Sequence, residues 1–121
     1  MDSNSFQKLV VWNKAIDLVT EIYKSTELLP SHEKYGITSQ LQRAAVSIPS
    51  NIAEGHGRRS NGDFARFLTI GLGSCREVQT LIIICEKLGY LQHNPELSNS
   101  CEEIAKMLTS LIRKIRESKV G

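Results

Sequence analysis

The chain has 121 residues, 40% of them hydrophobic and 23% charged, and a net charge of +2 at pH 7. This length allows one domain with a sizeable core but not two, so a single domain over residues 1–121 is expected. The net charge is too weak to demand a polyanionic partner. The longest apolar run is Leu81–Cys85 and the N-terminus lacks a signal-sequence pattern. The sequence therefore predicts a cytoplasmic protein without a membrane span.

Cysteine and histidine positions argue against a metal site. The three cysteines are Cys75, Cys85 and Cys101. Their number is odd, no two have metal-ligand spacing, and each falls in phase with an apolar stripe. We interpret them as small core residues in a reducing compartment. The three histidines lie far apart in the sequence, at expected helix ends or loops. No metal and no cofactor is expected.

The first helix is expected over about residues 6–27. Its apolar stripe consists of Trp12, Ile16, Val19 and Tyr23, together with Ala15 and Ile22. Pro30 ends this segment, because the residue before a proline avoids the helical region. Ser31 is then a suitable N-cap for the second helix.

The second helix has apolar residues on two faces of a helical wheel. The first face consists of Ile37, Leu41, Ala44, Ile48 and Ile52. A polar strip consists of Arg43, Ser47, Ser50 and Glu54. The second, mostly apolar face consists of Val46, Pro49 and Ala53. Because a helix that packs only within its own bundle needs one apolar face, this second face predicts contact with another copy of the chain.

Pro49 is expected to kink the second helix, since it lacks an N–H and its ring collides with the carbonyl of Ala45. Asn51 points toward the core face, where an amide must be hydrogen-bonded. We interpret Asn51 as a structural amide that satisfies the backbone freed by Pro49, and a ligand contact is the alternative.

Glycines and caps set the limits of the last two helices. Gly55-His56-Gly57 ends the second helix, and Ser60 opens a capping box with Asp63 for a third helix that extends to about residue 88. The small residues Gly71, Gly73 and Ser74 would let another backbone approach. Ile83 and Ile84 lie off the core stripe and indicate a second buried surface.

Gly89 is the expected C-terminal glycine of the third helix, and Asn94 and Pro95 open the fourth helix. Its apolar residues repeat in steps of three and four, at Leu97, Cys101, Ile104, Leu108, Leu111 and Ile115. No strand pattern is present. The sequence therefore predicts an all-α fold, an antiparallel up-down-up-down four-helix bundle with a kinked second helix.

A basic loop is the candidate functional site. Arg58 and Arg59 precede a helix N-terminus, where free N–H groups and guanidinium groups could hold a phosphate. A solvated loop is the alternative interpretation. Arg43 and Arg66 are second choices for contact with nucleic acid. No strand precedes the loop and no Walker lysine is in place in it, which excludes a nucleotide-binding fold of that type. No catalytic set of residues is found, so no enzymatic activity is expected.

Several segments resemble the S23 family, the four-helix-bundle proteins encoded in intervening sequences of bacterial 23S ribosomal RNA genes. The most specific is AAVSIPSNIAEG at Ala44–Gly55. The match extends over almost the whole chain, through VWNKA at 11–15, IYKST at 22–26, FARFL at 64–68 and LGYL at 88–91. Gln42 and Leu72 depart from the family, which often has a basic side chain at both positions.

The S23 family is similar to the accessory variability protein of diversity-generating retroelements, a ring of five subunits that partners a reverse transcriptase and nucleic acid. The resemblance implies a homopentamer with no known enzymatic activity, with RNA, DNA, a reverse transcriptase or another protein as partner. Two hypotheses follow. The chain is either an oligomeric adaptor that binds nucleic acid weakly, or a protein-interaction scaffold with solvated basic loops. Val46, Pro49, Ala53, Ile83 and Ile84 are the predicted oligomer interface.

Overall fold

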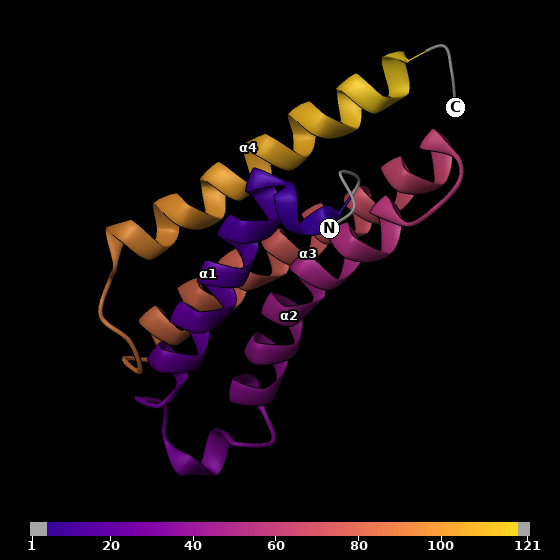
Figure 1. Cartoon of the computed structure of the whole chain (residues 1–121). Helices are drawn as coiled ribbons and strands as arrows, with labels where there is room; N and C mark the ends of the chain where they lie inside the picture. Colours follow the sequence, from indigo (N-terminus) through magenta and orange to yellow (C-terminus); the bar gives the residue numbers. More distant parts are fainter. Residues whose placement is uncertain (1–4, 119–121) are drawn as a thin grey trace.

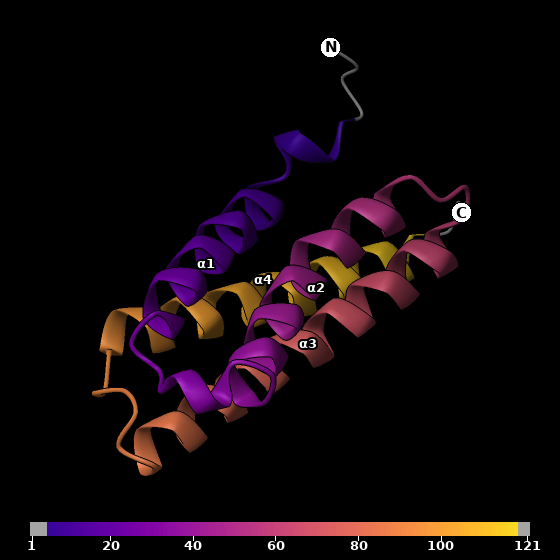
Figure 2. The same ribbon diagram turned by 90° about the horizontal axis from the view of Figure 1, so that it is seen from below.

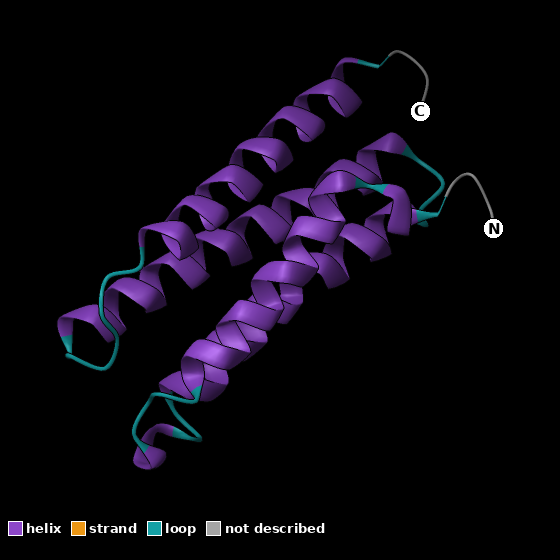
Figure 3. Cartoon of the chain, turned by 60° about the vertical axis from the view of Figure 1, so that its left-hand side comes forward, coloured by secondary structure: helices purple, strands orange, loops and turns teal. Residues whose placement is uncertain are grey.

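Local start and stop signals divide the chain into four α-helices. The computed structural model describes residues 5–118, and its α-helices are α1 Val10–Thr26, α2 Ile37–His56, α3 Asn61–Lys87 and α4 Pro95–Glu117. Two short 3-10 turns, η1 Phe6–Lys8 and η2 Ser31–Glu33, precede α1 and α2. No strand occurs between residues 5 and 118 (Figure 3).

Each helix packs on two neighbours. α1 and α3 both contact α2 and α4, and consecutive helices run in opposite directions (Figures 1 and 2). One hydrophobic core runs between the four helices. The antiparallel four-helix bundle predicted from the sequence is confirmed.

Three of the predicted helix boundaries are confirmed by capping geometry. The Ser60 side chain accepts a hydrogen bond from the Asp63 N–H at 3.1 Å, and the Asn94 side chain accepts one from the Leu97 N–H at 3.2 Å. Gly89 has a φ of 79°, the left-handed conformation that glycine adopts after a helix end.

The first two helices begin later than predicted. Residues 6–8 form a 3-10 turn and Leu9 is extended, so α1 starts at Val10. Ser31 does not cap α2 but begins the turn η2. The N-cap position of α2 is Gly36, which has no side chain, and the Glu33 carboxylate supplies the acceptor instead, for the Ile37 N–H at 3.3 Å.

The predicted apolar stripe of α1 is correct in part, since Ala15 and Ile22 are buried and Trp12 and Val19 pack against the core. The buried residues are Val11, Ala15, Leu18, Ile22 and Thr26. Ile16 and Tyr23 are instead 37% and 44% exposed. The helix carries apolar side chains around more than one face, so periodicity alone could not select the face that meets α2 and α4. The consequence is an unexpected exposed apolar flank on α1.

Pro49 and Asn51 are built into α2, which continues past Pro49 without interruption. Pro49 is buried. The Asn51 amide donates to the Ser47 carbonyl at 2.8 Å and to the Ser47 hydroxyl at 2.9 Å. Asn51 is thus a hydrogen-bonded amide of the fold, but the prediction that it satisfies the backbone freed by Pro49 is wrong, because it bonds to Ser47 and not to the Ala45 carbonyl. The kink at Pro49 stays a prediction.

α3 is long and apolar enough, by length and composition alone, to cross a membrane. A core helix of a bundle passes the same test, and α3 packs on both α2 and α4. Its buried side is formed by Ala65, Leu68, Gly71, Cys75, Val78, Leu81, Ile82 and Cys85. Of the apolar stretch of α3, 33% is buried inside the bundle. The absence of a membrane span stays a prediction.

The three cysteines are buried and free, which confirms their interpretation as core residues. The Cys75 thiol donates to the Cys101 carbonyl at 3.2 Å. Burial raises the pKa of Cys75 to about 11 and that of Cys101 to about 12.

These pKa values predict a loss of stability in alkali. The folded chain keeps both thiol protons to higher pH than the unfolded chain, whose thiols titrate near 9.0. The stabilising contribution is thus complete below pH 9 and declines as the pH rises through the folded pKa values. We expect the urea midpoint, followed by circular dichroism, to fall between pH 9 and pH 11. A Cys75→Ala/Cys101→Ala variant should show a smaller decline over that range, and an equal decline would contradict the assignment.

Candidate nucleic-acid interface

The C-termini of α2 and α4 and the N-terminus of α3 lie at the same end of the bundle. Because α3 runs antiparallel to both α2 and α4, its N-terminus lies beside their C-termini (Figures 1 and 2). The basic side chains of these helix ends and of the α2–α3 loop are Arg58, Arg59, Arg66, Arg113, Lys114 and Arg116. The acidic side chains there are Glu54, Asp63 and Glu117. We call this surface the basic end, and in its described part basic groups outnumber acidic ones two to one.

Two of the predicted arginines share one aromatic ring. The guanidinium carbons of Arg58 and Arg66 lie 4.8 Å and 4.6 Å from the Phe67 ring centroid. Arg58 Nη2 is 2.6 Å from Glu54 Oε2, and Arg66 Nε is 3.8 Å from Asp63 Oδ1. The ring contacts hold both guanidinium groups in place. The exposed carboxylates offset part of their charge, an effect that solvent and salt weaken.

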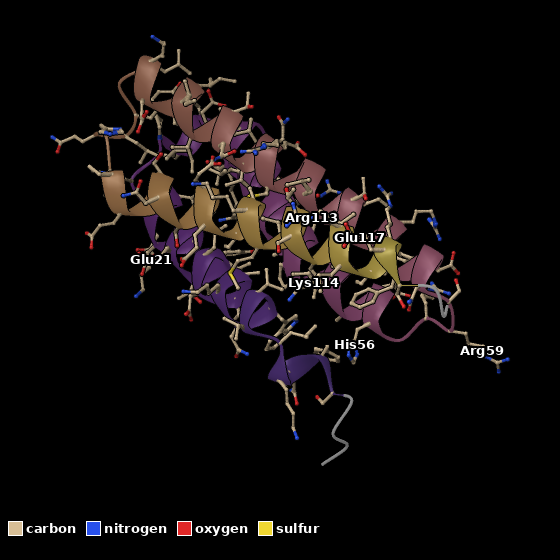
Figure 4. The ribbon with its side chains drawn as sticks, turned by 90° about the horizontal axis from the view of Figure 1, so that it is seen from above. Glu21, His56, Arg59, Arg113, Lys114 and Glu117 are labelled. Atoms are coloured by element: carbon tan, nitrogen blue, oxygen red, sulfur yellow. The ribbon has the colours of Figure 1, made fainter. Side chains whose placement is uncertain are left out.

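Arg59, unlike Arg58, makes no ion pair with the carboxylates of residues 5–118. It is exposed and projects outward from the α2–α3 loop (Figure 4). Arg113, Lys114 and Arg116, on the last turns of α4, also make no ion pair with these carboxylates, and their charge complements the helix dipole. Figure 4 shows Arg113 and Lys114 toward the same end as His56 and Arg59, whereas Glu21 lies at the far end. These unpaired cations are the most available charge of the basic end.

The basic run at the end of α4 was not among the candidate site residues. The position of α4 beside the α2–α3 loop depends on how far the two helices overlap, which no local pattern shows. The lengths of α3 and α4 and the short connection between them were the available signal. Lys119, the last basic residue of that run, lies outside the described residues.

Arg43 is not part of the basic end. It lines a pocket on the seam between α2 and α3, about 20 Å along α2 from His56 at the rise of an α-helix. The two departures from the family pattern have structural roles. Gln42 donates to the Thr26 hydroxyl at 3.0 Å and so links α2 to α1. Leu72 packs against the core.

The predicted oligomer interface is only partly exposed. Val46, Ile83 and Ile84 are 39%, 53% and 41% exposed, and Ala53 is half-buried. Pro49 is buried within the chain and offers little surface to a second copy, so the second face of α2 is narrower than predicted. The flank of α1 with Ile16 and Tyr23 is a further exposed apolar surface that was not predicted.

The fold and surface define an all-helical bundle with a basic end and exposed apolar side chains. Within residues 5–118, no group of three or more histidine, cysteine, aspartate or glutamate residues could hold a metal ion. The chain belongs to the 23S rRNA-intervening sequence protein family, whose model matches residues 7–110. The resemblance seen in the sequence is thereby confirmed.

A solved structure supports the same assignment. The chain is similar to a protein of unknown function from the S23 ribosomal protein family of Bacteroides thetaiotaomicron, with 26% sequence identity and a TM-score of 0.79. The similarity covers 86% of this chain and 99% of that one. No curated protein matches the chain.

Proposed function

We propose that the protein is a non-enzymatic, oligomeric adaptor of the cytoplasm that binds RNA or DNA weakly through its basic end. The observation that carries the proposal is the gathering of six basic side chains from the loop, α3 and α4 at one end of the bundle. Phosphate contacts from lysine and arginine supply affinity without regard to sequence. Arg59 and the α4 cations provide unpaired charge, while Arg58 and Arg66 are held against Phe67.

Assembly strengthens the proposed contact. A single copy neutralises few phosphates, whereas a closed oligomer, proposed here as a pentamer, repeats the basic end once per subunit. Repeated weak contacts raise avidity without any new interaction. The exposed Val46, Ile83 and Ile84 are the proposed interface between copies. No membrane is involved in this proposal.

A protein-interaction scaffold is the second candidate function. The observation that favours it is the exposed apolar flank of α1, with Ile16 and Tyr23, which the bundle leaves uncovered. A reverse transcriptase or another protein could bind there alongside nucleic acid or in place of it. Salt dependence separates the two candidates, because phosphate contacts weaken steeply as salt rises.

A titration of labelled single-stranded RNA and DNA at about 50 and 200 mM salt tests the proposal. We expect the protein to bind single-stranded RNA and single-stranded DNA of any sequence, and the affinity for both to fall strongly at the higher salt. An Arg58→Ala/Arg59→Ala variant should bind less tightly and show a salt slope reduced by about 1 for each phosphate that it no longer neutralises.

The matched control is Lys24→Ala/Lys87→Ala, which removes the same charge at the opposite end of the bundle, from the last turns of α1 and α3. It should bind as the wild type does. The oligomeric state of each variant is checked first by light scattering. Absence of binding at the lower salt, or equal binding by the arginine variant, would reject the basic end as the site and favour the scaffold.

A further inference from the structure

A polar pocket of about 520 Å³ lies on the seam between α2 and α3, away from the basic end. This volume is within the range of small-molecule sites. The pocket follows α2 from Gly36 to Ser47, about 16 Å at the rise of an α-helix, and includes Ser74 and Glu77 of α3. Arg43 lies in its middle.

The charged groups of this pocket have unused bonding capacity. No acceptor in residues 5–118 is bonded to the Arg43 guanidinium, although arginine has five donors. The Glu77 carboxylate accepts a single long hydrogen bond, from Gln40 Nε2 at 3.4 Å. A complementary ligand therefore carries an anionic group for Arg43 and a hydroxyl or amino donor for Glu77.

A pair of hydroxyl groups closes one end of the pocket. The Ser47 and Ser74 oxygens lie 2.8 Å apart, and Ser47 also accepts from the Asn51 amide. The two serines have two hydroxyl hydrogens, and their mutual hydrogen bond uses one of them. The other hydroxyl hydrogen can be donated to a ligand. An anionic group held by Arg43 is one helical turn from this pair along α2.

An aromatic ring marks the opposite end. Tyr35 is 88% exposed, which is unusual for a tyrosine of a folded domain. The Lys34 ammonium lies 5.4 Å from its ring centroid and covers one face. The other face is available for stacking by a planar ring.

The three recognition elements follow one another along the seam of α2 and α3: an aromatic ring just before α2, then a carboxylate of α3 with an amide of α2, then an arginine of α2 with hydroxyl groups from both helices. A nucleoside 5′-monophosphate has the same order of base, ribose and phosphate. We propose that this pocket binds one ribonucleotide unit, with its base on Tyr35, its ribose hydroxyls on Glu77 and its phosphate on Arg43 and the Ser47–Ser74 pair. Carboxylate recognition of a ribose 2′-hydroxyl distinguishes RNA from DNA.

This inference rests on the proposed function in one respect: the nucleotide is taken to be a unit of a bound strand. The contacts in the pocket would be the same for a free nucleotide. Titration calorimetry of the full chain with adenosine 5′-monophosphate, its 2′-deoxy analogue and ribose 5-phosphate tests it. We expect the ribonucleotide to bind roughly tenfold more tightly than the deoxynucleotide, the effect of one hydrogen bond to a charged group. Ribose 5-phosphate should also bind several-fold more weakly, because it lacks the stacking base.

Variants assign the contacts. Arg43→Gln should weaken ribonucleotide binding about tenfold or more, and Tyr35→Ala several-fold. Glu77→Gln should remove most of the preference for ribose over deoxyribose. All three side chains are exposed, and circular dichroism checks the fold. Arg76→Gln is the matched control, because Arg76 pairs with Glu102 of α4 at 3.1 Å and does not line the pocket, so this variant should bind the mononucleotide as the wild type does.

Two results would overturn the inference: no mononucleotide binding, or equal binding of ribonucleotide, deoxynucleotide and ribose 5-phosphate. Strand binding without mononucleotide binding would reject the pocket and leave the proposed function intact. Mononucleotide binding that depends on Arg43, without strand binding, would support the pocket and reject the proposed function.

Discussion

Gly55→Ala is expected to destabilise the bundle. A Cβ at position 55 would lie 2.7 Å from Phe67 Cβ, 3.0 Å from Phe64 Cδ1 and 3.2 Å from the Phe64 carbonyl oxygen. These atoms belong to or lie close to the α3 backbone, so α2 and α3 must separate to make room. Overpacking of this kind costs about 1–3 kcal/mol, which exceeds the helix-propensity gain of at most about 1 kcal/mol from replacing glycine by alanine.

Gly73→Ala is the matched control, since it places the same methyl group in α3 with nothing within 4 Å. It should raise the free energy of unfolding by about 0.5–1 kcal/mol, through the lower conformational entropy of the unfolded chain. Urea denaturation at one protein concentration measures both variants. Equal effects of the two substitutions would contradict the assignment of Gly55 as the contact between α2 and α3.

Several helix boundaries could be predicted from the sequence, but the contacts of these two glycines could not. Sequence periodicity and caps predicted four helices, because Ser60, Gly89, Asn94 and Pro95 act through local backbone chemistry. Close approach was assigned to Gly71, Gly73 and Ser74. Gly71 and Ser74 do face α2, whereas Gly73 has no neighbour within 4 Å, and the tighter contact between α2 and α3, at Gly55, was not predicted. Only the packing of α2 on α3 decides which glycine faces a neighbour.

The surfaces that the bundle leaves exposed also depend on helix packing and could not be predicted from the sequence alone. The predicted α1 stripe included the exposed Ile16 and Tyr23 and omitted the buried Leu18. Several faces of α1 carry apolar residues, and only the neighbouring helices select among them. Arg58 and Arg59 were identified from their loop, whereas the cations of α4 join them through tertiary packing. The pocket around Arg43 combines residues from two helices that are far apart in the sequence, so no local pattern could indicate it.

We also expect the protein to form a closed oligomer in solution. Light scattering at micromolar concentration should give a mass well above that of the 13.5 kDa chain, about five times as large for the proposed pentamer. The proposed interface contains Val46, Ile83 and Ile84, each more than a third exposed on the single chain. A ring buries one patch of each copy against a different patch of the next, so one substitution affects every interface.

Val46→Asp or Ile84→Asp should therefore dissociate the oligomer while leaving helicity largely intact, because a buried unpaired carboxylate is costly at an interface and tolerated in water. Leu28→Asp is the matched control, as Leu28 follows α1, is 73% exposed and lies outside the proposed interface. It should keep the wild-type mass. A monomeric wild type would show that Val46, Ile83 and Ile84 are exposed to solvent and form no interface. Each molecule would then have a single basic end, and the avidity argument for nucleic-acid binding would fail.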